Sequence, residues 1–270
     1  MVRRARLDAE LVRRGLARSR EQAAELIAAG AVLVGGQTAT KPATAVEPST
    51  PLRVAELDTG PTYASRGGHK LAGALAAFGA GGSGLTVAGR RCLDAGASTG
   101  GFTDVLLRAG AEHVTAVDVG YGQLAWALRT DDRVTVVDRT NVRTLTPDQI
   151  GGPAELTVAD LSFISLGLVL PALAACTSPD GDLVPMVKPQ FEVGRERLGS
   201  GGVVRNPEHR ADAVLGVARQ AATEGLGVAG VVASPLPGPS GNVEFFLWLR
   251  RGAPEADPEE IRTVVEEASR

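Results

Sequence analysis

The chain has 270 residues, enough for one large domain or for a medium domain joined to a small one. Its composition, 44% hydrophobic and 22% charged, is close to the globular average and excludes disordered, collagenous and coiled-coil chains. No apolar run approaches the roughly 18 to 20 residues of a membrane span, and the arginine-rich start lacks the apolar stretch of a secretory signal, so we expect a cytoplasmic protein. Cys92 and Cys176 lie in apolar runs and are expected to be buried free thiols, with no disulfide and no metal cluster.

Charge is divided unevenly along the chain. Residues 1–46 carry eight basic and four acidic side chains, whereas the remaining 224 carry 20 basic and 27 acidic ones, so only the N-terminal part is net positive. Of the basic residues, 25 are arginine and only three are lysine: Lys41, Lys70 and Lys188. Because arginine does not lose its proton in proteins whereas lysine can, these lysines are candidates for roles that arginine cannot fill.

The first segment predicts two short helices followed by a hairpin. An apolar face from Leu7 to Val12 indicates the first helix, and Ala23 to Ile27 indicates the second. Alternation around Val32 and Val34 indicates a strand. The boundaries are marked by glycines and by a capping-box pattern: Gly15, Ser19 with Gln22, Gly30 and Gly35-Gly36.

These residues resemble the S4 domain, an RNA-binding module of ribosomal protein S4 and of several RNA-modifying enzymes. The resemblance covers about residues 5–52 and rests on Arg6-Leu7-Asp8, Ser19-Arg20-Glu21-Gln22-Ala23, Ile27, Gly30, Val32, Val34 and Gly36. It implies structured RNA as the partner, although a solvated basic surface is the plainer alternative. The arginines that we expect to bind RNA are Arg4, Arg6, Arg18, Arg20 and Arg66. We place this domain at residues 1–58. A linker follows at residues 59–66, in a region that is rich in proline and glycine.

Residues 67–252 alternate between candidate strands and helices. The expected strands are Arg91–Asp94, His113–Asp118, Val134–Asp138, Leu156–Asp160, Leu183–Lys188, Val228–Ala233 and Val243–Leu249. The expected helices between them include Phe102–Ala109, Gln123–Leu128, Leu166–Ala175 and Pro207–Thr223. This alternation predicts an α/β, Rossmann-like, mostly parallel sheet. The last two strands have no helix between them and should pair antiparallel at one edge, which is typical of seven-stranded methyltransferase sheets. Residues 253–270 are expected to form an acidic tail.

Ligands of such sheets bind at the carboxyl ends of the strands, where four expected strands end in aspartate. The first runs into Asp94-Ala95-Gly96-Ala97-Ser98-Thr99-Gly100-Gly101-Phe102, which is neither a dinucleotide glycine motif nor a P-loop. It resembles motif I of S-adenosyl-L-methionine-dependent methyltransferases, although a tight strand–helix turn would look similar. Asp118 is expected to bind ribose hydroxyls. Either Asn141 or Asp138 is expected to contact the adenine. The expected cofactor-binding residues are Asp94, Gly96, Ser98, Gly100, Asp118, Asn141 and Asp160.

Four further residues converge on the same edge: Lys70, Asp160, Lys188 and Glu244. Without the glycine loop, a salt-bridge cluster would be the default interpretation. Their surroundings are Ser-Arg-Gly-Gly-x-Lys-Leu, Asp-Leu-Ser-Phe-Ile-Ser, Val-Lys-Pro-Gln-Phe-Glu and Gly-Asn-x-Glu. Together these motifs resemble the TlyA type, also catalogued as haemolysin A, of ribosomal RNA 2'-O-methyltransferases, whose catalytic domain is similar to the FtsJ type. The resemblance implies a catalytic tetrad of these four residues, S-adenosyl-L-methionine as cofactor, and cytidine ribose in ribosomal RNA as substrate.

The chemistry of such a reaction favours a lysine base. A ribose 2'-hydroxyl is a poor nucleophile, so the site must accept its proton and fix the angle of attack. Lys188 is the candidate base: burial and the neighbouring Lys70 would favour loss of its proton, whereas Asp160 and Glu244 would oppose it or orient the reacting groups. His69 is a rival base. An RNA-binding assembly factor without turnover and a haemolysin are the alternative functions, the latter without a physical mechanism in the sequence.

Overall fold

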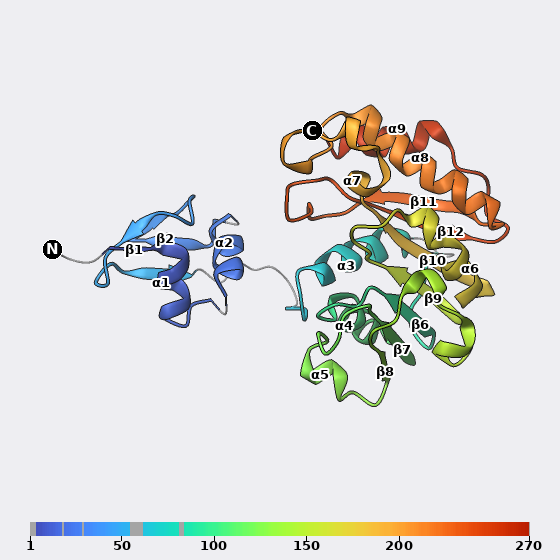
Figure 1. Cartoon of the computed structure of the whole chain (residues 1–270), viewed down its shortest axis with the longest axis horizontal. Coiled ribbons are helices and arrows are strands. Elements are labelled where there is room, and N and C mark those ends of the chain that lie inside the picture. Colours follow the sequence, from blue (N-terminus) through green and yellow to red (C-terminus); the bar gives the residue numbers. More distant parts are fainter. Residues whose placement is uncertain (1–3, 18, 29, 55–61, 81–83, 270) are drawn as a thin grey trace. The chain divides into compact units, whose positions relative to one another are not determined.

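The computed structural model describes residues 4–17, 19–28, 30–54, 62–80 and 84–269 and consists of two units that divide after Thr62 (Figure 1). Arg18 and residues 55–61, where the predicted linker begins, lie outside these described residues. Within the described part of the chain, none of the helices combines the length and apolar character that crossing a membrane requires.

The first unit packs two helices against short strands. Its elements are β1 Ala5–Arg6, α1 Leu7–Arg13, α2 Arg20–Ala28, β2 Val32–Val34, β3 Gln37–Thr38, β4 Ala45–Val46 and β5 Leu52–Val54. The strands form a ladder β1-β4 and a sheet β3-β2-β5, and Leu7, Leu11 and Ile27 fill the core between them and the helices. The predicted start of α2 is confirmed, because Ser19 Oγ accepts a hydrogen bond from the backbone N–H of Gln22 at 3.1 Å.

The second unit is built on a seven-stranded sheet of order β11-β12-β10-β9-β6-β7-β8. Its strands are β6 Arg91–Ala95, β7 His113–Val117, β8 Val134–Val137, β9 Ala154–Ala159, β10 Thr177–Val187, β11 Gly227–Ala233 and β12 Phe245–Arg250. Strands β6 to β10 pair in parallel, whereas β12 runs antiparallel to both β10 and β11. The predicted mostly parallel sheet with an antiparallel hairpin at one edge is therefore confirmed.

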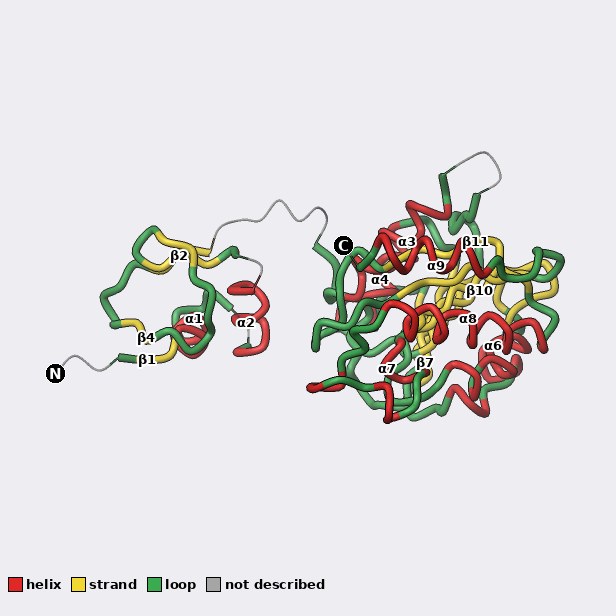
Figure 2. Tube along the Cα trace, turned by 90° about the horizontal axis from the view of Figure 1, so that it is seen from above, coloured by secondary structure: helices red, strands yellow, loops and turns green. Residues whose placement is uncertain are grey.

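Helices cover both faces of this sheet, as Figure 2 shows with helices in red and strands in yellow. They are α3 Gly67–Phe78, α4 Gly101–Arg108, α5 Trp126–Arg129, α6 Leu170–Cys176, α7 Pro189–Glu192, α8 Pro207–Thr223 and α9 Pro258–Glu267. Side chains alternate along each strand, so α3, α4 and α5 pack on one apolar layer and α6, α8 and α9 on the other. Cys92 and Cys176 lie in opposite layers as buried free thiols, as expected, and burial raises their pKa values to about 12 and about 11.

Three expected boundaries differ from the structure. Helix α5 begins only at Trp126, because Ala125 has a non-helical backbone with ψ 139° and donates its N–H to Thr99 O at 3.2 Å. The helix expected at 166–175 is divided into a 3-10 turn, Leu166–Leu168, and α6, which begins beside Pro171, a residue without an N–H. The acidic residues after 252 include α9, an amphipathic helix whose Ile261 and Val265 are buried against the sheet layer.

Candidate active site

The turn between β6 and α4 has the tight geometry that the glycine motif predicts. Gly96 has φ +89°, and a Cβ there would lie 2.5 Å from the carbonyl oxygen of Asp160. Gly100 caps α4 with φ +95°, and a Cβ there would overlap Leu128. Both conformations favour glycine. Because Gly96 lies so close to Asp160, which follows β9, the turn packs the end of β6 against the end of β9.

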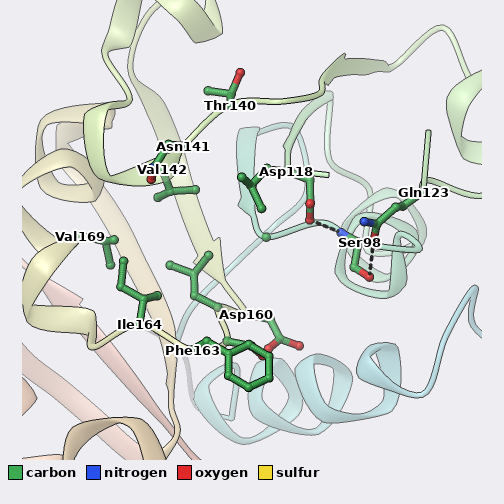
Figure 3. Close-up of a pocket in the computed structure, with 14 residues that line it drawn as sticks. Ser98, Asp118, Gln123, Thr140, Asn141, Val142, Asp160, Phe163, Ile164 and Val169 are labelled. Carbon is green, nitrogen blue, oxygen red and sulfur yellow. Dashed lines mark hydrogen bonds between the residues drawn. The ribbon is translucent and has the colours of Figure 1, made fainter. Parts of the chain in front are cut away.

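A cavity of about 460 Å³ opens beside this turn (Figure 3). Its polar side includes Gly96, Ser98, Asp118 and Asn141, and its apolar side includes Val119, Val142, Leu161, Phe163, Ile164 and Val169. The volume is in the range of small-molecule sites, and the division into polar and apolar walls suits a nucleoside.

Asp118 organises the polar wall of the cavity. It directly follows β7, and its Oδ2 accepts from the backbone N–H of Ser98 at 2.8 Å while Oδ1 accepts from Gly120 N at 2.7 Å. The carboxylate is thereby fixed at the cavity wall. Each of its oxygens has a second lone pair that can accept from a ligand hydroxyl.

The two candidates for the adenine contact differ in position. Asn141 lines the cavity, and its Oδ1 accepts from Arg143 N at 3.0 Å. Asp138 is absent from the cavity lining among the described residues, and its Oδ2 accepts from Arg129 at 3.1 Å and from Gly122 N at 3.2 Å. The geometry therefore favours Asn141.

Asp94 and Gly100 support the turn without lining the described cavity. Asp94 is fully buried, and its Oδ2 accepts from Thr103 Oγ1 of α4 at 2.7 Å, whereas its Oδ1 has no hydrogen-bond partner among the described residues. Burial is the main cause that raises the pKa of this carboxyl to about 7; the hydrogen bond from Thr103 opposes the rise, and the nearby carboxylates of Asp160 and Asp118 contribute to it. The structure thus places Asp94 beneath the turn between β6 and α4.

The four predicted tetrad residues form two ion pairs at the carboxyl edge of the sheet. Lys188 Nζ lies 2.6 Å from Asp160 Oδ1, and Lys70 Nζ lies 2.5 Å from Glu244 Oε2. Both lysines and Glu244 are buried. The first pair adjoins the cavity, because Asp160 is one of its lining residues.

The sheet register explains why residues so distant in sequence meet. Lys188 follows β10 and Asp160 follows β9, two adjacent parallel strands. The pairing of Val187 with Phe245 in β12 brings Glu244 to the same end. Lys70 comes from α3, whose first residue, Gly67, would place a Cβ 3.8 Å from Asp160 Oδ2.

Two contacts at this site were missed by the sequence analysis. Lys188 Nζ donates to Ser162 Oγ at 2.8 Å, and Ser162 also lines the cavity. The carboxylate of Glu192 accepts from Ser165 Oγ at 2.6 Å and from Leu166 N at 2.8 Å, which ties the loop after β9 to α7. Burial raises the pKa of Glu192. The motifs Asp-Leu-Ser-Phe-Ile-Ser and Val-Lys-Pro-Gln-Phe-Glu contain these residues, but spacing alone does not show which side chains meet.

His69, the rival base, is absent from the described cavity wall and packs edge-on against Tyr63 with ring centroids 5.0 Å apart. The expected RNA-binding arginines that the structure describes all have partners. Arg4 pairs with Glu47 at 3.2 Å, and Arg66 donates to Pro237 O at 3.0 Å. Arg6 and Arg20 both pair with Asp8, at 3.0 and 2.9 Å.

The sheet topology, the glycine turn and the cavity beside buried lysines define a methyltransferase-type α/β domain. Residues 63–251 match the family model of FtsJ-like methyltransferases, and residues 5–51 match the S4 domain. The chain belongs to the FtsJ-like methyltransferase family and carries an S4 domain before the catalytic-type domain.

Individual relatives share this arrangement. The 16S/23S rRNA (cytidine-2'-O)-methyltransferase TlyA of Mycobacterium tuberculosis is 65% identical over 93% of this chain and 91% of that protein. The Bacillus subtilis protein YqxC is 45% identical over 97% of this chain and 93% of that protein. A solved structure from Streptococcus thermophilus, described as a hemolysin, superposes with a TM-score of 0.77 at 40% identity and covers 99% of this chain and 96% of its own.

Proposed function

We propose that this protein is an S-adenosyl-L-methionine-dependent ribosomal RNA 2'-O-methyltransferase that acts on cytidine ribose in the RNA of the small subunit, the large subunit or both. The observation that carries the proposal is the Lys188–Asp160 pair at the wall of a cavity with nucleoside-like complementarity. The TlyA relative, for which this activity is named, supports the choice of substrate. Action in the cytoplasm is part of the same proposal.

The described cavity fits the cofactor. Its apolar wall, with Val142, Ile164 and Val169, suits a purine ring, and Asn141 offers a polar group at its edge. Asp118 is fixed by two backbone N–H groups and suits ribose hydroxyls. S-adenosyl-L-methionine, when bound, supplies a methyl group on a sulfonium centre that is ready for nucleophilic attack.

Lys188 is the residue that we assign to the proton of the ribose 2'-hydroxyl. Its amine is held by Asp160 Oδ1 and Ser162 Oγ, which accounts for two of its possible hydrogen bonds and leaves a third direction for the substrate oxygen. Before proton transfer the neutral amine can donate its two N–H groups to Asp160 and Ser162 and direct its lone pair at the 2'-hydroxyl, and after transfer the ammonium keeps both of these hydrogen bonds. Lys70 and Glu244 complete the site by supporting the substrate ribose.

The N-terminal domain, residues 1–58, supplies the RNA contact in this proposal. The described arginines on its surface are suited to phosphate, and its affinity should therefore fall steeply with salt. The family models match an S4 domain and a catalytic-type domain in this one chain, which fits an enzyme that binds a large RNA and modifies one of its riboses.

The test is transfer of a labelled methyl group from S-adenosyl-L-methionine to unmodified 30S and 50S ribosomal subunits. Wild-type protein should place label in the RNA at positions resistant to alkaline cleavage, which identifies the ribose 2'-oxygen. Lys188→Ala should bind the cofactor without transferring label. Cofactor binding by the wild type without label on either subunit would contradict the proposal and favour an RNA-binding assembly factor.

A further inference from the structure

The first unit contains a buried carboxylate that the proposed function does not use. Asp8, the second residue of α1, is only 4% exposed. It lies in the stretch Arg6-Leu7-Asp8, in which the sequence analysis assigned a function to the arginine alone. A buried carboxylate requires partners, and those of Asp8 are two of the arginines expected to bind RNA.

Asp8 holds these two arginines together. Arg6 donates to both of its oxygens, from Nε to Oδ1 at 3.1 Å and from Nη2 to Oδ2 at 3.0 Å. Arg20, from α2, donates from Nη2 to the same Oδ2 at 2.9 Å. Because both Nη2 atoms contact one oxygen, they lie within 5.9 Å of each other.

The two guanidinium groups remain open to solvent while their anchor does not. The side chains of Arg6 and Arg20 are 52% and 59% exposed, against 6% for Asp8. The carboxylate is itself fixed, because the backbone N–H of Ala9 donates to Oδ1 at 2.8 Å. Hydrogen bonds from Arg6, foremost, and from Arg20 hold the pKa of Asp8 well below its usual range.

The charge balance of this trio suits a phosphodiester. Two guanidinium groups and one carboxylate leave a net charge of +1, and a backbone phosphate brings −1. Without Asp8 the two cations would repel each other and sample many rotamers, so binding a phosphate would first have to order them. Arg6 donates to Asp8 from Nε and Nη2, so the opposite edge of its planar guanidinium group points away from Asp8.

A neighbouring cluster shows that such pairing does not serve one purpose throughout the unit. Glu10 holds Arg13 and Arg14, but Arg14 is only 21% exposed and also donates to the carbonyl oxygens of Thr50 and Pro48. Arg14 therefore ties α1 to the segment before β5. Arg6 and Arg20 have no such backbone acceptors among the described residues. Fixing their side chains therefore ties no other segment in place, and we expect it to serve an external partner.

We propose that Asp8 is a positioning residue for RNA binding, which fixes Arg6 and Arg20 as a preorganised pair for one backbone phosphate of the substrate RNA. The inference rests on the proposed function for its partner. It reverses the expectation from net charge: removal of a negative charge from a basic RNA-binding surface should strengthen binding, but removal of this one should weaken it.

The experiment measures the affinity of the full chain for in vitro transcribed 16S and 23S rRNA as a function of salt. Asp8→Asn should bind about tenfold more weakly than wild type, with the slope of log affinity against log salt reduced by about one. The matched control is Glu21→Gln, which removes the same charge from an exposed position in α2 and should leave binding unchanged or slightly tighter. Binding by Asp8→Asn as tight as or tighter than wild type would overturn the inference.

A second variant decides the matter should Asp8→Asn lose its fold, as judged by circular dichroism. Arg6→Lys/Arg20→Lys keeps both charges at exposed positions but lacks the planar forks, and it should lose affinity to a similar degree. Arg53→Lys, at an exposed position in β5, is its control and should bind as wild type does. Wild-type affinity of the double variant would also overturn the inference. Absence of RNA binding by the wild type would instead contradict the proposed function.

Discussion

In the second unit the lysines of the two tetrad ion pairs are buried, each against one carboxylate. In the first unit the carboxylates are buried and most of the cations are not: Asp8 and Glu10 are buried, and each holds two arginines, of which all but Arg14 are largely exposed. The same chemical groups are thus arranged for different purposes. A buried cation interacts strongly with its few neighbours and can take part in proton transfer, whereas an exposed cation on a buried anchor remains available to a partner's phosphate.

This difference also explains the distribution of lysine and arginine. Two of the three lysines occupy the tetrad ion pairs, where the proposed function requires a group able to release a proton, whereas the other described ion pairs of the second unit use arginine. The first unit's ion pairs use arginine alone among the described residues, where a permanent charge and a planar fork are sufficient. Variants of each arrangement should therefore affect different steps, the lysine pairs methyl transfer and the arginine clusters RNA binding.

The largest effect should come from replacing a buried lysine by arginine. Lys188→Arg keeps the charge but cannot serve as a base, so methyl transfer should fall by about 10²-fold or more while cofactor binding persists. Lys41→Arg, an exposed position in the first unit, is the control and should transfer methyl groups at the wild-type rate. Substantial turnover by Lys188→Arg would remove the proton-accepting role.

The two units should respond to pH in opposite directions. Burial raises the pKa of Asp94 from 3.8 to about 7. Between these values the unfolded chain has released a proton that the folded chain keeps. The contribution of Asp94 to the free energy of unfolding is therefore full below about pH 4 and is lost as the pH rises through 7. This loss amounts to at most about 4 kcal/mol. Hydrogen bonds from Arg13, foremost, lower the pKa of Glu10 from 4.5 to about 2, so its contribution is present above pH 4.5 and is lost as pH falls through 2.

Urea unfolding followed by tryptophan fluorescence checks the Asp94 part, because both tryptophans, Trp126 and Trp248, lie in the second unit. Asp94→Asn cannot ionise, so its stability relative to wild type should increase between pH 5 and pH 8. An unchanged difference across this range would show that Asp94 does not titrate there. Asp148→Asn, at an exposed position, should show no such trend.

Loss of the carboxylate at the cavity wall should affect the cofactor alone. Asp118→Asn should weaken binding of S-adenosyl-L-methionine about ten- to a hundredfold, the range for losing a hydrogen bond to a charged group. Isothermal titration calorimetry measures this change, again with Asp148→Asn as the control. RNA affinity should stay at the wild-type value, and a fall in RNA affinity would show that the two units do not bind their ligands separately.

A smaller effect should follow from loosening the loop that carries Ser162. Ser165→Ala removes one of the two donors to the half-buried Glu192, which should lower the free energy of unfolding by about 1–3 kcal/mol and slow turnover only a few-fold. Ser200→Ala, at an exposed position, should change neither. Full turnover with unchanged stability in Ser165→Ala would show that this anchor is dispensable.

The sequence predicted the strands and the edge where the site lies, because alternation marks strands and parallel strands end at one edge. The positions of the strand ends were therefore sufficient to group Asp160, Lys188 and Glu244. They did not show that Asp160 pairs with Lys188 and Glu244 with Lys70, since such pairing depends on rotamers and on the register between β10 and β12. Helix α9 within the acidic tail was not predicted, because the charges obscured the helical spacing of Ile261 and Val265.

The anchoring side chains were harder to predict than the charged groups they hold. Ser162 and Asp8 stand in quoted motifs, but a hydroxyl or carboxylate beside a cation is also common on solvated surfaces. Only burial and hydrogen-bond geometry distinguish an anchor from such a neighbour. Asp94 was assigned to the cofactor from its motif alone, and its burial and its hydrogen bond with Thr103 of α4 became visible only in the structure.

The most direct test of this division between the units is the steady-state methylation of unmodified ribosomal subunits by Ser162→Ala and by Asp8→Asn, compared in parallel. Ser162→Ala should lower kcat and leave the KM for the subunits unchanged, because it loosens the Lys188 amine. Asp8→Asn should raise that KM about tenfold and leave kcat unchanged, because it disturbs only the phosphate contact. A change of kcat by Asp8→Asn, or of KM by Ser162→Ala, would contradict the account that one unit holds the RNA and the other performs the chemistry.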